Sequence, residues 1–67
     1  MSVAKVSEIS ATSTVGFAEA IKEGLDRSNK TLRNVRSAWI KEQHVRVRDD
    51  KIAEYQVNMM VTFVIDD

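Results

Sequence analysis

The side chain in this sequence best suited to hold a planar ligand is its single tryptophan, Trp39. It lies in the run NVRSAWIKEQ, residues 34–43, where apolar residues are interspersed with charged ones as in a strand. An indole can fill a core, bury area in a subunit interface or stack on a ligand. A chain of 67 residues has little core to offer. We therefore expect Trp39 on a sheet surface or at an interface, with a ligand platform as the alternative.

Three basic side chains alternate along the same predicted strand, namely His44, Arg46 and Arg48. Such a cluster can hold a phosphate or the tail of a cofactor through charge-assisted hydrogen bonds. The alternative is a solvated strand that pairs with Glu54 across a hairpin.

Four aspartates lie at the turn of this hairpin and at the end of the chain, namely Asp49, Asp50, Asp66 and Asp67. Carboxylate oxygens are ligands that calcium accepts, although these four do not follow the EF-hand spacing. Subunit contacts could bring them together around an ion. The alternative is that they are simply solvated.

Other chemistries lack the residues that they need. The sequence has no cysteine, which excludes disulfides and thiolate metal sites, and one histidine cannot build a His-based zinc site. It contains no Ser-His-Asp spacing, no glycine-rich phosphate loop and no HExxH motif. We therefore expect a binding protein and not an enzyme.

Length and charge restrict the partners further. Ten basic and ten acidic residues cancel, so no strong field attracts nucleic acid or acidic lipid. The start, MSVAKVSEIS, has no long apolar run, so we expect no signal peptide or membrane span and a cytoplasmic location. Residues 1–67 form a single domain at most. A chain this short buries only roughly 60% of its unfolded surface, which makes oligomerisation the expected support.

The elements that must position these side chains follow a β-α-β-β pattern. The hydrophobic period predicts strands over about 3–10, 35–48 and 52–66, a turn at 49–51, and an amphipathic helix over about 15–31 that Ser13 or Thr14 caps. This order predicts an α+β fold in which a three-stranded antiparallel sheet packs on one helix. Gly24, inside the helix, is expected to mark a close approach to another backbone.

The last predicted strand alternates strictly between two faces. One face carries apolar residues from Ala53 to Ile65, whereas the other carries Met60 and Val64 among polar residues. The first face must receive the helix. The other face would leave an apolar patch and an edge strand in a monomer, so we expect a homo-oligomer. The predicted core is Phe17, Ile21, Leu25, Val57, Val61 and Phe63.

Taken in order, these segments resemble the dodecins. The resemblance is carried by KVSEISATS at the start, RSNKTLRNV at the end of the helix and EYQVNMMVTF near the end of the chain, and it covers nearly the full length. It implies a β-α-β-β subunit, a hollow homododecameric shell, and binding or storage of a flavin such as FMN or riboflavin.

In flavin-binding dodecins, a tryptophan on the second strand stacks on the flavin ring and a glutamine on the third strand contacts its polar edge. The glutamine is Gln56, in EYQV, whereas the stacking position counted from TLRNV is Ser37. Trp39 comes two residues later, on the same face but roughly 7 Å farther along the strand. His44 lies where the family often has an arginine that contacts a phosphate, and Arg46 is close by.

The lack of a ring at Ser37 makes the chain similar to dodecins without the stacking tryptophan, some of which bind calcium. Two functions therefore stay open. The first is flavin binding and buffering by Ser37, Trp39, His44, Arg46 and Gln56. The second is a flavin-poor shell that binds calcium or has a structural role.

Overall fold

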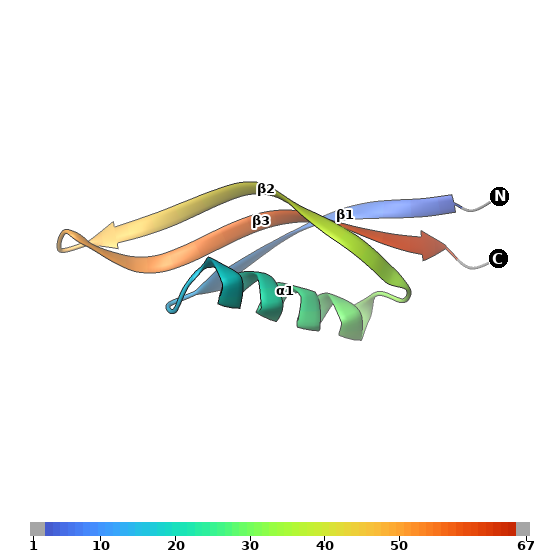
Figure 1. Cartoon of the computed structure of the whole chain (residues 1–67), viewed down its shortest axis with the longest axis horizontal. Helices are drawn as coiled ribbons and strands as arrows, with labels where there is room; N and C mark the ends of the chain where they lie inside the picture. Colours follow the sequence, from blue (N-terminus) through green and yellow to red (C-terminus); the bar gives the residue numbers. More distant parts are fainter. Residues whose placement is uncertain (1–2, 66–67) are drawn as a thin grey trace.

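The computed structural model describes residues 3–65, and its elements run in the order β-α-β-β (Figure 1). These elements are β1 (Val3–Ser13), α1 (Phe17–Thr31), β2 (Val35–Arg48) and β3 (Lys51–Ile65). β3 is the central strand and pairs antiparallel with both neighbours, in the order β1-β3-β2. The predicted α+β fold is confirmed. Within residues 3–65, no helix has the length and apolar character needed to cross a membrane.

The first strand and the start of the helix differ from the sequence prediction. β1 continues past its expected end, because it stays paired with β3 as far as Ser13 opposite Tyr55. The predicted caps, Ser13 and Thr14, were wrong: the N-cap is Gly16, and no side chain in the described part of the chain bonds to this helix end. The Ser13 hydroxyl instead accepts a hydrogen bond of 3.0 Å from the backbone N–H of Val15. Strand pairing therefore holds Ser13 outside the capping position.

A stripe of small residues lets α1 lie close to the sheet. Ala20, Gly24 and Ser28 are the buried residues of the helix, and their spacing of four places them on one face. A Cβ added to Gly24 would lie 3.1 Å from the Cβ of Ala11 and would clash with the terminal methyl of Met59. The predicted close approach therefore exists, but it is made to side chains of β1 and β3.

The fully buried core lies between α1 and the central strand. Met59 is the largest residue in it, and two core residues expected from the sequence pattern are confirmed, Val57 and Val61. The hydrophobic residues with no exposed surface are Ala20, Val57, Met59 and Val61.

The aromatic and larger aliphatic residues form the margin of this core. Phe17 packs edge-on against Tyr55 with ring centroids 5.1 Å apart. Phe63 was expected to be buried but is only partly so, because the strands continue beyond the C-terminal end of α1 (Figure 1). The predicted core residues that are partly exposed are Phe17, Ile21, Leu25 and Phe63.

The hairpin of β2 and β3 extends as an arm beyond α1 and β1 (Figure 1). Its two-residue turn consists of Asp49 and Asp50, whose φ angles of 53° and 62° match a primed hairpin turn. Lys51, expected in the turn, is the first residue of β3. Apolar side chains near the end of the arm remain exposed, with Val47 at 65% and Ile52 at 51%.

Candidate functional site

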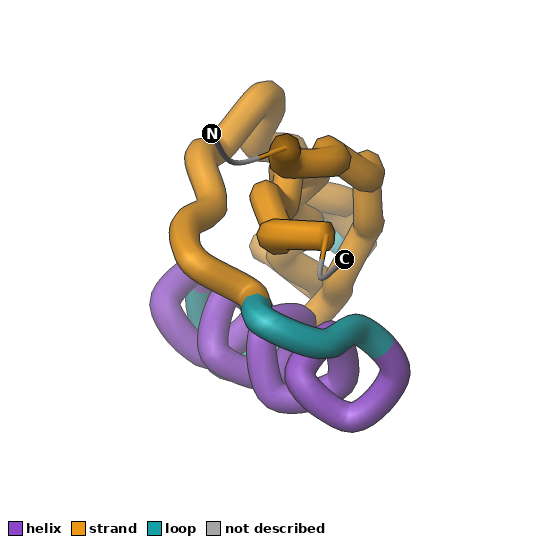
Figure 2. The backbone as a smooth tube through the Cα atoms, turned by 90° about the vertical axis from the view of Figure 1, so that its right-hand side faces the viewer, coloured by secondary structure: helices purple, strands orange, loops and turns teal. Residues whose placement is uncertain are grey.

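The helix covers only one face of the sheet, as the view along the long axis in Figure 2 shows. We call the opposite face the open face. The strand register assigns to it alternate residues of each strand, and these include all five candidate site residues. The residues of the open face are Ala4, Val6, Glu8, Ser10 and Thr12 of β1, Ser37, Trp39, Glu42, His44 and Arg46 of β2, and Glu54, Gln56, Asn58, Met60, Thr62 and Val64 of β3.

Ser37 and Trp39 share the open face, as the sequence analysis predicted. Ser37 lies opposite Thr62 and Trp39 lies opposite Met60, so the two positions are one step apart on the same side. Register shifts occur on either side of this stretch, between Val35 and Ser37 and after Ile40, but none falls between Ser37 and Trp39. The Trp39 side chain is 51% exposed, so within a single chain it fills no core.

Gln56 lies at the centre of a hydrogen-bond network that joins all three strands. Its Oε1 accepts a bond of 2.6 Å from Nη2 of Arg46 on β2. Its Nε2 donates to the hydroxyl of Ser10 on β1 at 3.0 Å and to Oδ1 of Asn58 at 3.2 Å. Both amide protons have acceptors, and Oε1 keeps one lone pair for a further donor. The network therefore fixes which way the amide points.

Each basic group near Gln56 has a carboxylate beside it. Arg46 Nε donates to Oε1 of Glu54 at 3.1 Å. The predicted pairing with Glu54 across the hairpin is thus present, and it occupies a group that was a candidate for holding phosphate. His44 Nε2 lies 3.7 Å from Oε2 of Glu42, an ion pair only when the imidazole is protonated. Asn58 Nδ2 donates to the other oxygen of Glu42 at 3.3 Å.

An ion pair crosses the central strand and divides the open face. Lys41 of β2 donates to Oε1 of Glu8 on β1 at 3.2 Å, and Glu8 lies directly opposite Met60 of β3. On one side of this pair lie Trp39, Ser37 and the apolar ends of β1 and β3. On the other side lie Gln56, His44 and Arg46. The sequence-predicted site residues therefore form two groups and not one cluster.

The register also sets the distance between these groups. Trp39 lies opposite Met60, which is four residues from Gln56 along β3, or roughly 13 Å at the rise of a strand. The two side chains therefore project from rows that are two repeats of the strand apart on the open face.

Only two of the four candidate calcium ligands lie within the described residues. Asp49 and Asp50 form the hairpin turn, and Asp66 and Asp67 lie outside the described residues. Within residues 3–65, no group of three or more His, Cys, Asp or Glu side chains could hold a metal ion.

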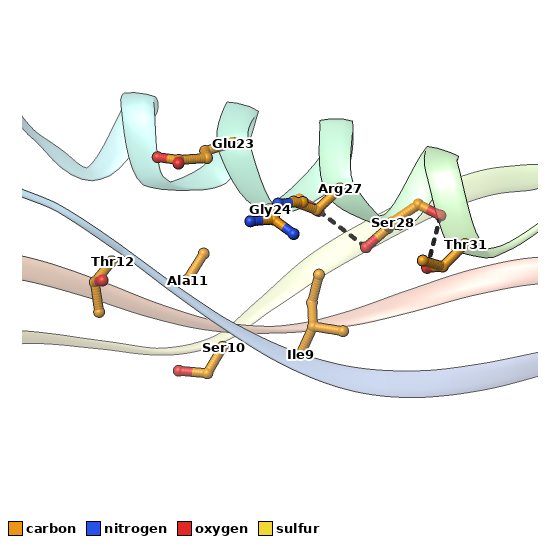
Figure 3. Close-up of a pocket in the computed structure, with 9 residues that line it drawn as sticks. All are labelled: Ile9, Ser10, Ala11, Thr12, Glu23, Gly24, Arg27, Ser28 and Thr31. Carbon is orange, nitrogen blue, oxygen red and sulfur yellow. Dashed lines mark hydrogen bonds between the residues drawn. The ribbon is translucent and has the colours of Figure 1, made fainter.

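Two grooves flank the helix and were not expected from the sequence. One, of about 400 Å³, lies between α1 and β1, with Glu23 and Arg27 on its helix side (Figure 3). Its buried hydroxyl, on Ser28, donates to the carbonyl of Gly24 at 2.9 Å. The other, of about 380 Å³, lies between α1 and β2 and is lined by apolar residues that include Leu25 and Ile40. Hydrophobic period places residues on a face but does not say over which strands the helix lies, so the sequence held no signal for either groove.

Comparison with known proteins agrees with this geometry. The family model described as Dodecin matches residues 3–66. The dodecin from Streptomyces davaonensis is 33% identical, with a TM-score of 0.94 over 98% of this chain and 97% of that chain. An arginine-to-alanine variant of the Thermus thermophilus dodecin is also 33% identical, with a TM-score of 0.95 over all of both chains.

A more distant match comes from Mycobacterium tuberculosis. It is described as a calcium-chelating immunodominant antigen, calcium dodecin, with a novel calcium-binding site. It is 26% identical, with a TM-score of 0.83 over 96% of this chain and 91% of that chain. No curated protein sequence matches this one. Because the family model spans almost the whole sequence and the solved dodecins share the complete fold, this chain belongs to the dodecin family.

Proposed function

We propose that this protein binds and stores a planar ligand of the flavin class on the open face of its sheet, within a shell of identical copies, and that it catalyses no turnover. The observation that carries this proposal is the Gln56 amide. Three hydrogen bonds to three other side chains fix it on a face that no element of the chain covers. A preorganised amide of this kind can recognise the polar edge of a heterocycle at little cost in side-chain entropy.

The same face carries apolar side chains that can pack against a neighbouring copy. Trp39 and Met60 lie side by side on neighbouring strands, and the indole is half exposed. Ser37, at the family's stacking position, offers no ring. Because aromatic stacking contributes only about 0.5–1.5 kcal/mol beyond area burial, its loss should weaken binding without abolishing it.

The exposed apolar residues support assembly into a homo-oligomer. Trp39 on the open face and Val47 and Ile52 on the arm would stay in water in an isolated chain. A contact between copies would remove them from water, and the separation of Trp39 from Gln56 along the sheet favours a ligand shared between copies. We expect light scattering to give a mass near twelve subunits. A folded monomer at micromolar concentration would contradict the shell and, with it, the shared site.

Trp39 also allows a test of its own role. We propose that its indole buries area against a neighbouring copy and does not itself stack on the flavin. Trp39→Ala should then raise the concentration below which the oligomer dissociates, by a larger factor than it weakens flavin affinity. Loss of flavin binding from an intact oligomer would instead make Trp39 the platform. Ser37→Trp should strengthen flavin binding if the rest of the site is intact.

Ligand binding is tested by titrating the purified oligomer with riboflavin and following the quenching of flavin fluorescence. We expect saturable quenching, and we expect Gln56→Ala to lower the affinity for riboflavin by about twofold to tenfold, in line with the loss of about 0.5–1.5 kcal/mol for a neutral hydrogen bond. The matched control is Gln43→Ala, because Gln43 is an exposed glutamine that pairs with Val57 on the helix side of the sheet. No quenching by the unaltered protein, or equal losses in both variants, would contradict flavin binding at Gln56.

Calcium is the second candidate, favoured by the similarity to the calcium dodecin of Mycobacterium tuberculosis. Within residues 3–65 of one chain no acidic cluster could hold an ion, so we propose a calcium site that combines oxygen ligands of several copies. Isothermal titration of the metal-free oligomer with calcium chloride separates the two functions. Tight calcium binding together with an absence of flavin quenching would select this candidate.

A further inference from the structure

We propose that the open face selects planar ligands that carry no phosphate group, so that riboflavin binds more tightly than FMN. This inference rests on the proposed function. It follows from the ion pairs around Gln56, in which Arg46 and Lys41 each lie against a carboxylate.

The carboxylates on this part of the open face outnumber its permanent cations. Arg46 is held by Glu54 at 3.1 Å and by the oxygen of Gln56 at 2.6 Å, and Lys41 is held by Glu8 at 3.2 Å. The remaining carboxylate belongs to Glu42, which lies beside His44.

A phosphate placed beside Gln56 would therefore meet opposing carboxylates. The guanidinium of Arg46 keeps N–H groups that neither Glu54 nor Gln56 uses, but a phosphate bound to them would lie next to the carboxylate of Glu54, which repels it. Of the other cations of the hairpin, Arg48 and Lys51 flank Asp49 and Asp50 at the far end of the arm, and Arg36 lies at the opposite end of β2.

Two copies that met at their open faces would bring the same pairs, so each added cation would arrive with its own carboxylate. The uncharged hydroxyls of a ribityl chain face no such repulsion. They can donate to Glu42 or to the free lone pair of Gln56, and they can accept from the amide of Asn58.

The size of the effect follows from the exposure of these groups. The Arg46 and Glu54 side chains are 63% and 36% exposed, so water screens them strongly. Charges about 4 Å apart in a water-like dielectric interact by about 1 kcal/mol, which corresponds to roughly a fivefold change in affinity. We expect riboflavin to bind about threefold to tenfold more tightly than FMN at low ionic strength, and the ratio to shrink as salt screens the repulsion.

The experiment titrates the intact oligomer with riboflavin and with FMN at pH 8, in low and in high salt, and follows flavin fluorescence. The key variant is Glu54→Gln, which removes the carboxylate from Arg46 and keeps the shape of the side chain. We expect FMN affinity to rise by about fivefold while riboflavin affinity stays within about twofold. The matched control is Asp26→Asn, which makes the same change of charge at an exposed position on α1. It should leave the ratio unchanged.

The outcomes separate this inference from the proposed function. If FMN binds as tightly as riboflavin or more tightly, the face does not select against phosphate, and flavin binding still stands. If Glu54→Gln shifts the ratio no more than Asp26→Asn does, the Arg46–Glu54 pair is not the determinant and the inference is wrong. If neither flavin is bound, the proposed function and the inference both fail.

Discussion

The two faces of this sheet are made by the same strands, yet they are held together by different interactions. On the face under α1, contiguous apolar side chains exclude water, and Val57, Met59 and Val61 have no exposed surface. On the open face, hydrogen bonds and ion pairs join the strands through groups that remain in contact with water. Burial of apolar surface stabilises a fold by about 25 cal/mol for each Å² removed from water, so a few buried side chains contribute several kcal/mol. An exposed ion pair contributes at most about 1 kcal/mol. The covered face therefore stabilises the subunit, and the open face is free to meet ligands and copies.

Neighbouring methionines on β3 provide the sharpest test of this contrast, with the largest expected effect. Met59 is fully buried under the helix, whereas Met60 lies on the open face. Met59→Ala should lower the free energy of unfolding by about 2–5 kcal/mol, because it removes contacts and leaves a cavity. Met60→Ala should lower it by less than half as much. Chemical denaturation of both variants measures the difference, and similar losses would mean that the open face is also a packed core in the assembled protein.

Gly24 tests how closely the helix must lie on the covered face. Gly24→Ala improves helix propensity by about 1 kcal/mol, but its Cβ would meet Met59 and Ala11. Overpacking of a filled core costs about 1–3 kcal/mol, so we expect a net loss of about 1–2 kcal/mol. Adding Met59→Leu shortens the side chain that conflicts with the new methyl and should recover part of the loss. A Gly24→Ala protein that is more stable than the original would show that the helix can move away from the sheet freely.

The smallest expected effect concerns the ion pair that divides the open face. Both partners are about half exposed, with Lys41 at 51% and Glu8 at 44%. Lys41→Met keeps most of the aliphatic side chain and removes the charge. We expect it to change the free energy of unfolding by no more than about 0.5 kcal/mol. A loss comparable to that of Gly24→Ala would indicate that the pair is buried in the assembly.

Much of this protein could be read from its sequence because the dominant signals are local. Alternation along 52–66 and the helical period after Val15 identify the elements and their apolar sides, since the two regular structures repeat with different periods. Because side chains two residues apart on a strand share a face, Ser37 and Trp39 were predicted on one face, and the register confirms this. Alternation along β3 also places Gln56 on that face. His44 and Arg46 share it with Trp39 only because a register shift between Ile40 and Glu42 reverses the alternation of β2, and no feature of the sequence indicated that shift.

Tertiary structure decided what periodicity does not specify. Pairing with β3 carried β1 as far as Ser13 and moved the helix start to Gly16. The position of α1 over β1 and β3 decided which core residues are fully buried and left an apolar groove beside β2. The joining of Gln56 to Ser10, and of Lys41 to Glu8, depends on contacts between residues far apart in the chain. The strand order brings these residues together, and local sequence patterns do not encode that order.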